Sequence, residues 1–510
     1  MPITREAAVR RKRNVIFNND GDDALHYGHT LSGPATKQGL LSLRMDHIGD
    51  TGIDTVYYCT TQNFNAFTHD SQVTEIFATT EGAFSGNRTA ELIAQGIDPL
   101  QVAIECCRQH GIEVFWTHRL NDIHDTFWEE MISQWKKDHP GFLMGERADK
   151  DKYPFSDPRH VWTYVDYAND EVRDQVVVAF RDVLQRYDVD GIDLDFLRNP
   201  AYFRETRLGE PVTVEHRDML TDMVARVRQE VLAESERRDK PILMSARVLP
   251  TIDLNTQFGF DVRRWIEHRD VDFISVAGGY DPFTMPLKNM VDLGHDWGIP
   301  VNACLSVSGF IGAVHGVEDA QVGNTIESWR AAAANAWHAG VDGIMTFNLF
   351  PSLPKTAETE FSRQVWRDIG DSEELTKKEK VYCIENLEEL YNTGFMVRSV
   401  PIDGRLPIEV AKQSSVERTL PVADNVADDP QSTCRLCLRI CVAELDADDV
   451  LTAHLNGSEL DLKPEKPQWL SADVPPSVVR MGKNVLSISY ERGAAATRSI
   501  KLVELIVRYG

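Results

Sequence analysis

A single short strand sets the strongest constraint on how this chain can fold. The segment 187–200 reads Tyr-Asp-Val-Asp-Gly-Ile-Asp-Leu-Asp-Phe-Leu-Arg-Asn-Pro. Because strand side chains alternate, its two faces differ: Ile192, Leu194 and Phe196 lie on one, and Gly191, Asp193 and Asp195 on the other. Buried carboxylates are costly unless they are paired, so this strand does not fit a plain hydrophobic core. It fits a parallel β/α barrel, whose strands pack on helices outside and lead to a site at their carboxyl ends.

Eight short apolar segments alternate with helical patterns between residues 14 and 348. We predict these strands: Asn14–Asn18, Thr55–Thr60, Glu113–Thr117, Gly191–Phe196, Ile242–Arg247, Phe273–Ala277, Val301–Leu305 and Gly343–Phe347. One connecting helix has Asn169 or Asp170 as its N-cap, and another covers Asp218–Ala233. This order favours an α/β fold, a closed (β/α)8 TIM barrel, over an open doubly wound sheet. The tetrapeptide Val-Asp-Gly-Ile occurs at 189–192 and at 341–344, where two half-barrels would correspond.

The sequence changes character after Pro354. Phe361–Ile369 reads as a closing helix, and a charged connector follows at 371–380. From Val381 onward the chain shows short alternating strands and turns, among them a hairpin built on Asn456-Gly457. We therefore expect two domains, a catalytic barrel at 1–370 and an all-β, jelly-roll-like sandwich at 371–510.

The composition indicates which kinds of partner the protein is expected to bind and which it is not. The formal net charge is −25, and a surface this acidic repels nucleic acid and anionic membranes, so we expect neither as a partner. No run of eighteen apolar residues exists that could span a bilayer. The N-terminal segment lacks the apolar stretch of a secretory signal, which favours a cytoplasmic protein, or a periplasmic or secreted one if a signal peptide has been removed. The sequence gives no indication of the oligomeric state.

The cysteines favour packing over metal binding. Cys434, Cys437 and Cys441 resemble part of a metal site, but no second cluster completes four ligands. The segment 433–442 also reads as a strand, in which such thiols pack into a core. We predict neither a bound metal nor a cofactor.

Polar side chains concentrate where the predicted barrel strands end, which is where barrel chemistry takes place. The residues that we expect to bind substrate are Asp20, Trp116, His118, Arg119, Asp193, Arg198, Arg247, Tyr280 and Asn348. Hydrolysis of a glycosidic bond usually needs two carboxyl groups, one ionised and one kept protonated. Asp195, at the end of its strand and beside Arg198 or Arg247, is our candidate for the ionised group.

The second catalytic carboxyl group has two candidates, Asp281 and Asp122. Asp281 follows an apolar, flexible turn and adjoins Tyr280, a setting that raises the pKa of a carboxyl group as a general acid needs. Asp122 lies among His118, Arg119 and His124, whose positive charge suits substrate binding better. We favour Asp281 and keep Asp122 as the other candidate.

Two further groups of residues allow more than one interpretation. Asp20, Asp22 and Asp23 could bind calcium, but they lack the spacing of an EF-hand loop, and a turn or the binding of substrate hydroxyls fits them better. The arginines at 119, 198 and 247 could pair with an anionic sugar or orient the catalytic acids. The sequence favours neither role over the other.

Two segments of the chain, 169–174 and 187–200, together resemble a known family. Asn-Asp-Glu-Val-Arg-Asp at 169–174, followed by a helix and by the segment 187–200, resembles the bacterial glycosyl-hydrolase-like barrel family. That family has the form Tyr-Asp-Val-Asp-Gly-Ile-His-Leu-Asp-x-x-Arg-x-Pro, so the resemblance puts Asp195 at the place of its catalytic aspartate and Arg198 at that of its arginine. Asp193 stands where the family often has histidine. Chitinase-type barrels are similar too, but Leu197 occupies the place of their essential glutamate, so their mechanism is not carried over.

We therefore predict a glycoside hydrolase that acts on an oligo- or polysaccharide. The three arginines are compatible with an anionic sugar as well as with a neutral one. A metal-dependent lyase or isomerase that uses Asp20, His118, Asp122 and His124 is one alternative. A carbohydrate-binding protein on an inactive barrel is the other. The sequence does not distinguish retaining from inverting hydrolysis, because the separation of the two carboxyl groups decides between them.

Overall fold

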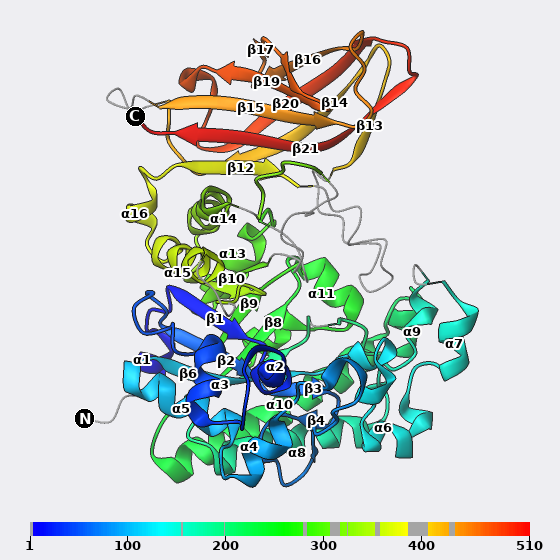
Figure 1. Cartoon of the computed structure of the whole chain (residues 1–510), viewed down its shortest axis with the longest axis vertical. Helices are drawn as coiled ribbons and strands as arrows, with labels where there is room; N and C mark the ends of the chain where they lie inside the picture. Colours follow the sequence, from blue (N-terminus) through cyan, green and yellow to red (C-terminus); the bar gives the residue numbers. More distant parts are fainter. Residues whose placement is uncertain are drawn as a thin grey trace.

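The fold is taken from a computed structural model of the 510-residue chain. The structure describes residues 4–154, 157–197, 199–278, 283–306, 317–323, 325–351, 357–385, 406–427 and 434–510. Within these ranges the chain forms a β/α barrel and, after it, two packed antiparallel sheets (Figure 1).

Eight parallel strands close the barrel, which confirms the predicted fold class. In the order around the barrel they are β1 (Val15–Asn19), β2 (Thr55–Cys59), β6 (Glu113–Arg119), β7 (Gly191–Asp195), β8 (Leu243–Val248), β9 (Phe273–Val276), β10 (Val301–Ser306) and β11 (Gly343–Phe347). Each agrees with a predicted strand to within two residues at either end. Sequence order and spatial order coincide, as right-handed β/α connections require.

Helices surround this ring and bury their apolar faces on the outside of the strands. The longer ones are α5 (Pro99–His110), α8 (Asp170–Arg186), α10 (Val214–Arg238), α13 (Lys288–Asp296), α14 (Ile326–Ala339) and α15 (Ala357–Ile369). Shorter helices, of which α1 and α7 bury no residue, are α1 (Arg5–Val9), α2 (Asp23–Thr30), α3 (Lys37–Arg44), α4 (Thr89–Ala94), α6 (Gln134–Asp138), α7 (Arg147–Lys152), α9 (Arg204–Arg207), α11 (Ile252–Phe258), α12 (Val262–Glu267) and α16 (Ser372–Leu375). Helix α10 begins four residues before the predicted start, because the Thr213 side chain caps the amide of His216 there.

Four aspartates hold neighbouring barrel strands together at their amino ends. They directly precede β2, β7, β9 and β11, the second, fourth, sixth and eighth strands of the ring. Each accepts a hydrogen bond from a backbone amide on the preceding strand of the ring. The pairs, from amide nitrogen to carboxylate oxygen, are Val15 to Asp54 at 3.2 Å, Val114 to Asp190 at 3.0 Å, Met244 to Asp272 at 2.8 Å and Val301 to Asp342 at 2.8 Å. In every pair the aspartate's own amide bonds back to the same partner's carbonyl. The repeated Val-Asp-Gly-Ile tetrapeptide contains two of these four aspartates, Asp190 and Asp342.

The C-terminal region forms two facing antiparallel sheets. One runs β12 (Lys380–Ile384), β21 (Thr497–Arg508), β15 (Arg435–Val442), β19 (Trp469–Val474) and β18 (Lys463–Lys466), with β13 (Ile408–Ala411) also paired to β21. The other runs β14 (Ser414–Val422), β20 (Gly482–Arg492), β16 (Val450–Leu455) and β17 (Ser458–Leu460). The predicted hairpin joins β16 to β17, and both Asn456 and Gly457 have the positive φ that its turn demands. Cys434 packs in the core between these sheets.

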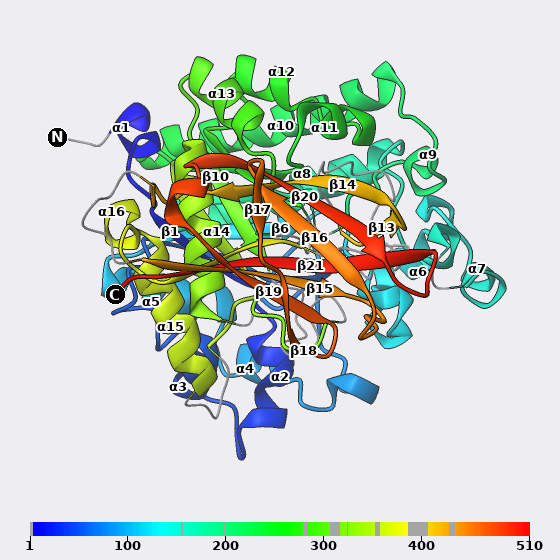
Figure 2. The same cartoon turned by 90° about the horizontal axis from the view of Figure 1, so that it is seen from above.

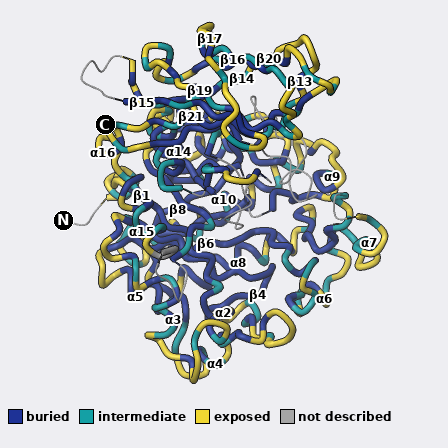
Figure 3. Tube along the Cα trace, turned by 45° about the horizontal axis from the view of Figure 1, so that its top comes forward, coloured by how far each residue is buried: buried dark blue, intermediate teal, exposed yellow. Residues whose placement is uncertain are grey.

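The barrel and the sandwich share an apolar interface. Seen from above, the sandwich overlies the barrel (Figure 2), and β12 lies against α14 (Figure 1). Cys383, Cys441, Trp469 and Leu502 of the sandwich belong to the same buried cluster as the barrel core. Burial is continuous across the strands of both parts, whereas peripheral segments such as α7 are exposed (Figure 3). Among the described residues, we find no helix with the length and apolar character needed to cross a bilayer.

Candidate active site

Three neighbouring strands place charged side chains level with one another at their carboxyl ends. The register pairs Arg119 of β6 with Asp195 of β7, and Asp195 with Arg247 of β8. Because residues paired in a parallel sheet point to the same face, these three side chains lie together on the inner face of the barrel. Their position is the end of the barrel where catalytic groups gather.

Asp195 and Arg247 form a buried ion pair with two parallel contacts. The Arg247 Nε donates to Asp195 Oδ1 at 2.9 Å, and a guanidinium nitrogen, Nη2, donates to the second oxygen. The Leu197 amide also donates to Oδ1 at 2.9 Å. On the other side, the Arg247 guanidinium carbon lies 4.2 Å from the Phe347 ring centroid. Such a two-point contact fixes the plane of the carboxylate as well as its charge.

Asp193 lies on the same face of β7 as Asp195, two residues nearer the amino end of the strand, and is buried. The Ser245 Oγ donates to its Oδ1 at 2.7 Å, and the Tyr57 Oη lies 2.9 Å from the same serine hydroxyl. Burial, with the negative charge of Asp195 adding to it, raises the pKa of Asp193 to about 7. This position suits a carboxyl group that holds a proton beneath the site better than one that contacts substrate. Tyr57 is a member of the network that sequence reasoning missed.

Arg119 connects two acidic loops at the same end of the barrel. Its Nη2 lies 2.6 Å from Asp20 Oδ1 in the loop after β1, and its Nη1 lies 3.5 Å from Asp122 Oδ2 in the loop after β6. The two carboxylate oxygens of Asp122 are 2.7 Å and 2.9 Å from Nδ1 of His124. Asp122 is thus fully buried between Arg119 and His124, two of the three basic residues that the sequence placed around it. Of the three arginines predicted for the site, the two that the structure describes, Arg119 and Arg247, are paired with aspartates.

The loop after β1 holds a second group of acids, and an arginine neutralises them. Arg44, from α3, contacts Asp22 and lies 3.3 Å from Asp23. Asp23 also accepts hydrogen bonds from Asn19 at 3.2 Å and from the Tyr58 hydroxyl at 3.3 Å. Burial raises the pKa of Asp23 to about 6, against the opposing effect of Arg44. Arg44 was not among the residues predicted from the sequence, because it lies on a helix that carries no recognisable motif.

Trp116 and His118 require a correction. In β6 they alternate with Arg119, so they point out of the barrel, where Trp116 packs on Phe180 of α8. The Trp116 Nε1 donates to Thr60 Oγ1 at 2.7 Å, and His118 stacks on Trp116. Burial lowers the pKa of His118 to about 3, so the ring stays neutral. Both side chains fill the layer between strand and helix, and we remove them from the set expected to bind substrate.

Of the four remaining predicted residues, the structure describes Asn348. Asn348 follows β11 directly, is half-buried and has a positive φ of 57°. Arg198, Tyr280 and Asp281 lie outside the described residues. Within the described ranges, no cluster of three or more histidine, cysteine or acidic side chains has the arrangement of a metal site.

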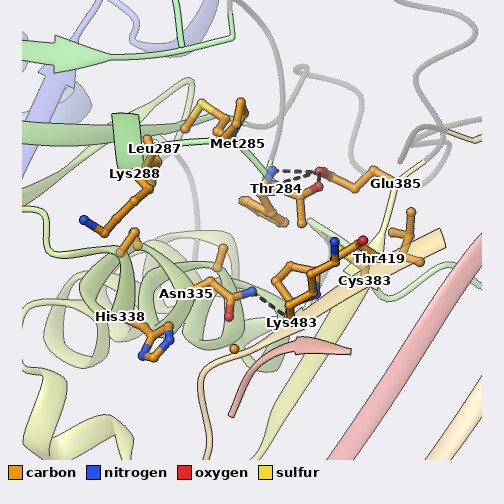
Figure 4. A pocket seen from close by; sticks show the side chains of 18 of the residues that line it. Thr284, Met285, Leu287, Lys288, Asn335, His338, Cys383, Glu385, Thr419 and Lys483 are labelled. Atoms are coloured by element: carbon orange, nitrogen blue, oxygen red, sulfur yellow. Dashed lines mark hydrogen bonds between the residues drawn. The ribbon is translucent and has the colours of Figure 1, made fainter. Parts of the chain in front are cut away.

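A separate cavity of about 490 Å³ lies between the barrel and the sandwich (Figure 4). Its wall is mostly apolar, with Met285 and Leu287 from the barrel and Cys383 from the sandwich. Glu385 is the one carboxyl group among its described lining residues, and it points toward Thr284 (Figure 4). A lining of this kind lacks the two carboxyl groups that glycosidic hydrolysis uses.

Comparisons with known proteins bear on the barrel. Residues 41–278, from α3 to just past β9, match the model of the family described as glycosyl hydrolase-like 10. This match confirms the resemblance drawn from the sequence. A comparison with curated proteins gives no match.

Solved structures are similar at low identity. An α-L-fucosidase from Paenibacillus thiaminolyticus is 10% identical, with 94% of this chain and 100% of that chain covered and a TM-score of 0.44. The glycoside hydrolase domain of PgaB from Bordetella bronchiseptica is 10% identical, with 66% and 93% covered and a TM-score of 0.41. An Anoxybacillus α-amylase is 11% identical, with 96% and 100% covered and a TM-score of 0.38. At these scores the similarity carries no argument about substrate or mechanism.

Proposed function

We propose that this protein, whose barrel matches a glycosyl hydrolase-like family, hydrolyses glycosidic bonds of an oligo- or polysaccharide. The observation that carries the proposal is the Asp195–Arg247 ion pair at the carboxyl ends of β7 and β8. Carbohydrate hydrolysis in a barrel needs a charged carboxylate held in a fixed orientation at that end. The two-point contact with the guanidinium supplies the fixed orientation.

Asp195 acts as nucleophile or base in this proposal, and Arg247 positions it. The proton for the leaving sugar oxygen comes from a second carboxyl group, for which we propose Asp281 ahead of Asp122. The surroundings of Asp122 support this order, because its carboxylate is engaged by both Arg119 and His124. Asp122 and Asp20, held by Arg119, then serve to bind substrate hydroxyl groups.

The surroundings of Arg119 and Arg247 bear on whether the substrate is an anionic or a neutral sugar. Arg119 and Arg247 each pair with an aspartate, which supports a role in orienting the acids more than one in binding an anionic sugar. An unpaired guanidinium would have supported an anionic sugar. The experiment therefore has to include neutral and anionic polysaccharides side by side.

The test is a screen for released reducing ends, with soluble starch, laminarin, xylan, polygalacturonate and alginate as substrates. Asp195→Asn serves as the inactive reference, and Asp188→Asn serves as the matched control because Asp188 lies on the same segment but at the surface. We expect activity on at least one polysaccharide that Asp188→Asn retains and Asp195→Asn loses. Activity that Asp195→Asn retains in full would refute the assignment of Asp195, and no activity on any of the five would count against the proposed hydrolysis.

A further inference from the structure

An exposed tryptophan lies in the loop that follows β6. Trp128 is 41% exposed, although its indole is among the largest apolar groups in the chain. Single exposed apolar side chains are common, so Trp128 is informative through its place near the candidate site, where aromatic side chains often line ligand sites. One other tryptophan in the described ranges is comparably exposed, Trp297 at 39%, and it follows α13 just before β10. Trp297 is therefore at the amino-terminal end of the barrel, away from the candidate active site.

Neighbouring rings hold Trp128 in one orientation. The His124 ring lies nearly parallel to the indole, at an interplanar angle of 17° and a centroid distance of 5.9 Å. Phe84 and Phe127 meet it edge-on, each with centroids 6.3 Å away. Stacked and edge-on contacts of this kind fix a ring against rotation. The part of the indole that these rings leave uncovered accounts for its 41% exposure.

A continuous series of contacts links this ring to the candidate active site. His124 contacts Asp122, Asp122 pairs with Arg119, and Arg119 lies level with Asp195 on the neighbouring strand. The loop between them is firmly anchored, because the ammonium group of Lys136 is buried 2.7 Å from Asp125 and bonds the Asp122 carbonyl at 3.3 Å. The indole is thus preorganised on the same loop as Asp122.

We infer that the exposed part of the Trp128 indole is a platform for one sugar ring of a bound saccharide chain, at a subsite beside the one that is cleaved. A pyranose ring has an apolar C–H face that packs on an indole, while the hydroxyl groups at its rim stay available to polar groups around the ring. The inference rests on the proposed function, because it assigns a carbohydrate to this end of the barrel. It names a binding residue and gives Trp128 no part in bond cleavage.

Binding without turnover tests this subsite. Affinity electrophoresis through gels that contain starch, laminarin, xylan, polygalacturonate or alginate measures the dissociation constant of the full-length protein in an Asp195→Asn background. We expect one or more gels to retard the parent, and Trp128→Ala to weaken that binding about tenfold, the equivalent of about 1.4 kcal/mol. Trp128→Phe restores most of the retardation because it keeps an aromatic face. Trp297→Ala, which removes an equally exposed indole from the other end of the barrel, leaves binding unchanged.

The outcomes separate this inference from the proposed hydrolysis. Retardation that depends on Trp128 supports the platform even if the active parent shows no reducing-end release. Equal retardation of Trp128→Ala and the parent overturns the platform and leaves the hydrolytic proposal intact. Retardation by none of the five gels, or an equal loss with Trp297→Ala, overturns the platform as well.

Discussion

Glu385 directly follows β12, Glu504 lies on the adjacent strand β21 of the same sandwich sheet, and each accepts hydrogen bonds from the backbone of a different barrel loop. Glu385 receives the amides of Phe283 and Thr284, both at 3.0 Å. Glu504 of β21 receives the amides of Gln321 and Val322 at 2.6 Å and 3.3 Å. The two loops follow β9 and β10 at the carboxyl ends of the barrel strands. The sandwich thus holds two loops at the end of the barrel that carries the site.

Each glutamate is expected to control its own loop. Glu385→Ala removes a buried acceptor, which leaves the amides of Phe283 and Thr284 unpaired at a cost of about 1.5–3 kcal/mol. Hydrogen exchange of these two amides should therefore rise by at least about tenfold. Glu504→Ala should have the same effect on Gln321 and Val322, and each variant serves as the control for the other. Uniform acceleration throughout the barrel would show that the glutamates support global stability instead.

The buried carboxyl of Asp193 predicts that stability falls as pH rises. Its pKa is about 7 in the folded protein, raised by burial from an ordinary value near 4. The folded state therefore binds the proton more tightly than the unfolded state between these values. The free energy of unfolding should decrease through that window, by about 4 kcal/mol at most.

Asp193→Asn tests this dependence because asparagine resembles the protonated acid and does not titrate. Calorimetry at pH 5 and pH 8 should show Tm of the variant rising relative to the parent as the pH increases. Asp188→Asn, a surface change on the same segment, should show no such trend. A Tm difference that is constant between the two pH values would contradict the prediction.

Asp195→Asn should lower kcat by at least about a thousandfold, which corresponds to roughly 4 kcal/mol of transition-state stabilisation. The near-isosteric change keeps the fold, although Tm should drop because the buried guanidinium of Arg247 loses its charged partner. Circular dichroism verifies the fold, and steady-state kinetics on the polysaccharide identified by the screen gives kcat. Wild-type turnover in this variant would rule out Asp195 as the catalytic carboxylate.

A pH–rate profile should identify the general acid. An acid must be protonated to act, so activity declines as pH rises above its pKa, and that decline forms the basic limb of the profile. We expect Asp281→Ala to remove the basic limb together with most of kcat. Asp122→Ala should raise KM and keep the limb, because Asp122 lies in a basic setting that suits binding. The reverse pattern would make Asp122 the acid.

Removing the sandwich after residue 371 should leave a poorly soluble barrel. The cut exposes the apolar surface that α14 presents to β12, along with the barrel residues that pack on Trp469 and Leu502. It also removes both loop-holding glutamates. Size-exclusion chromatography of the truncated barrel should show aggregation, and co-expression with residues 372–510 should relieve it. A soluble, monomeric and fully active barrel would refute this dependence.

The fold could be predicted from sequence because the barrel strands are short apolar runs between well-marked helices. The register of side chains was predicted for β7 but was not extended to its neighbour. Counting from Arg119 would have put Trp116 and His118 on the outer face, because parallel pairing aligns them with Ile192 and Leu194. The Asp195–Arg247 pair was one of two that the sequence left open, because both residues lie near the carboxyl ends of neighbouring predicted strands. Arg44 and Trp128 could not, since a helix and a loop bring them to the site without any periodic pattern.

The four aspartates at the amino ends of the barrel strands have a consequence for how such a protein can evolve. They close the ring in pairs of strands at the end opposite the Asp195–Arg247 pair. Residues that maintain the barrel are therefore different from residues that do its chemistry, and the two groups are separated by the length of a strand. Loops at the carboxyl ends can accept insertions or exchange their side chains while the other end stays fastened. A lineage with this arrangement can acquire new substrates without first losing its scaffold.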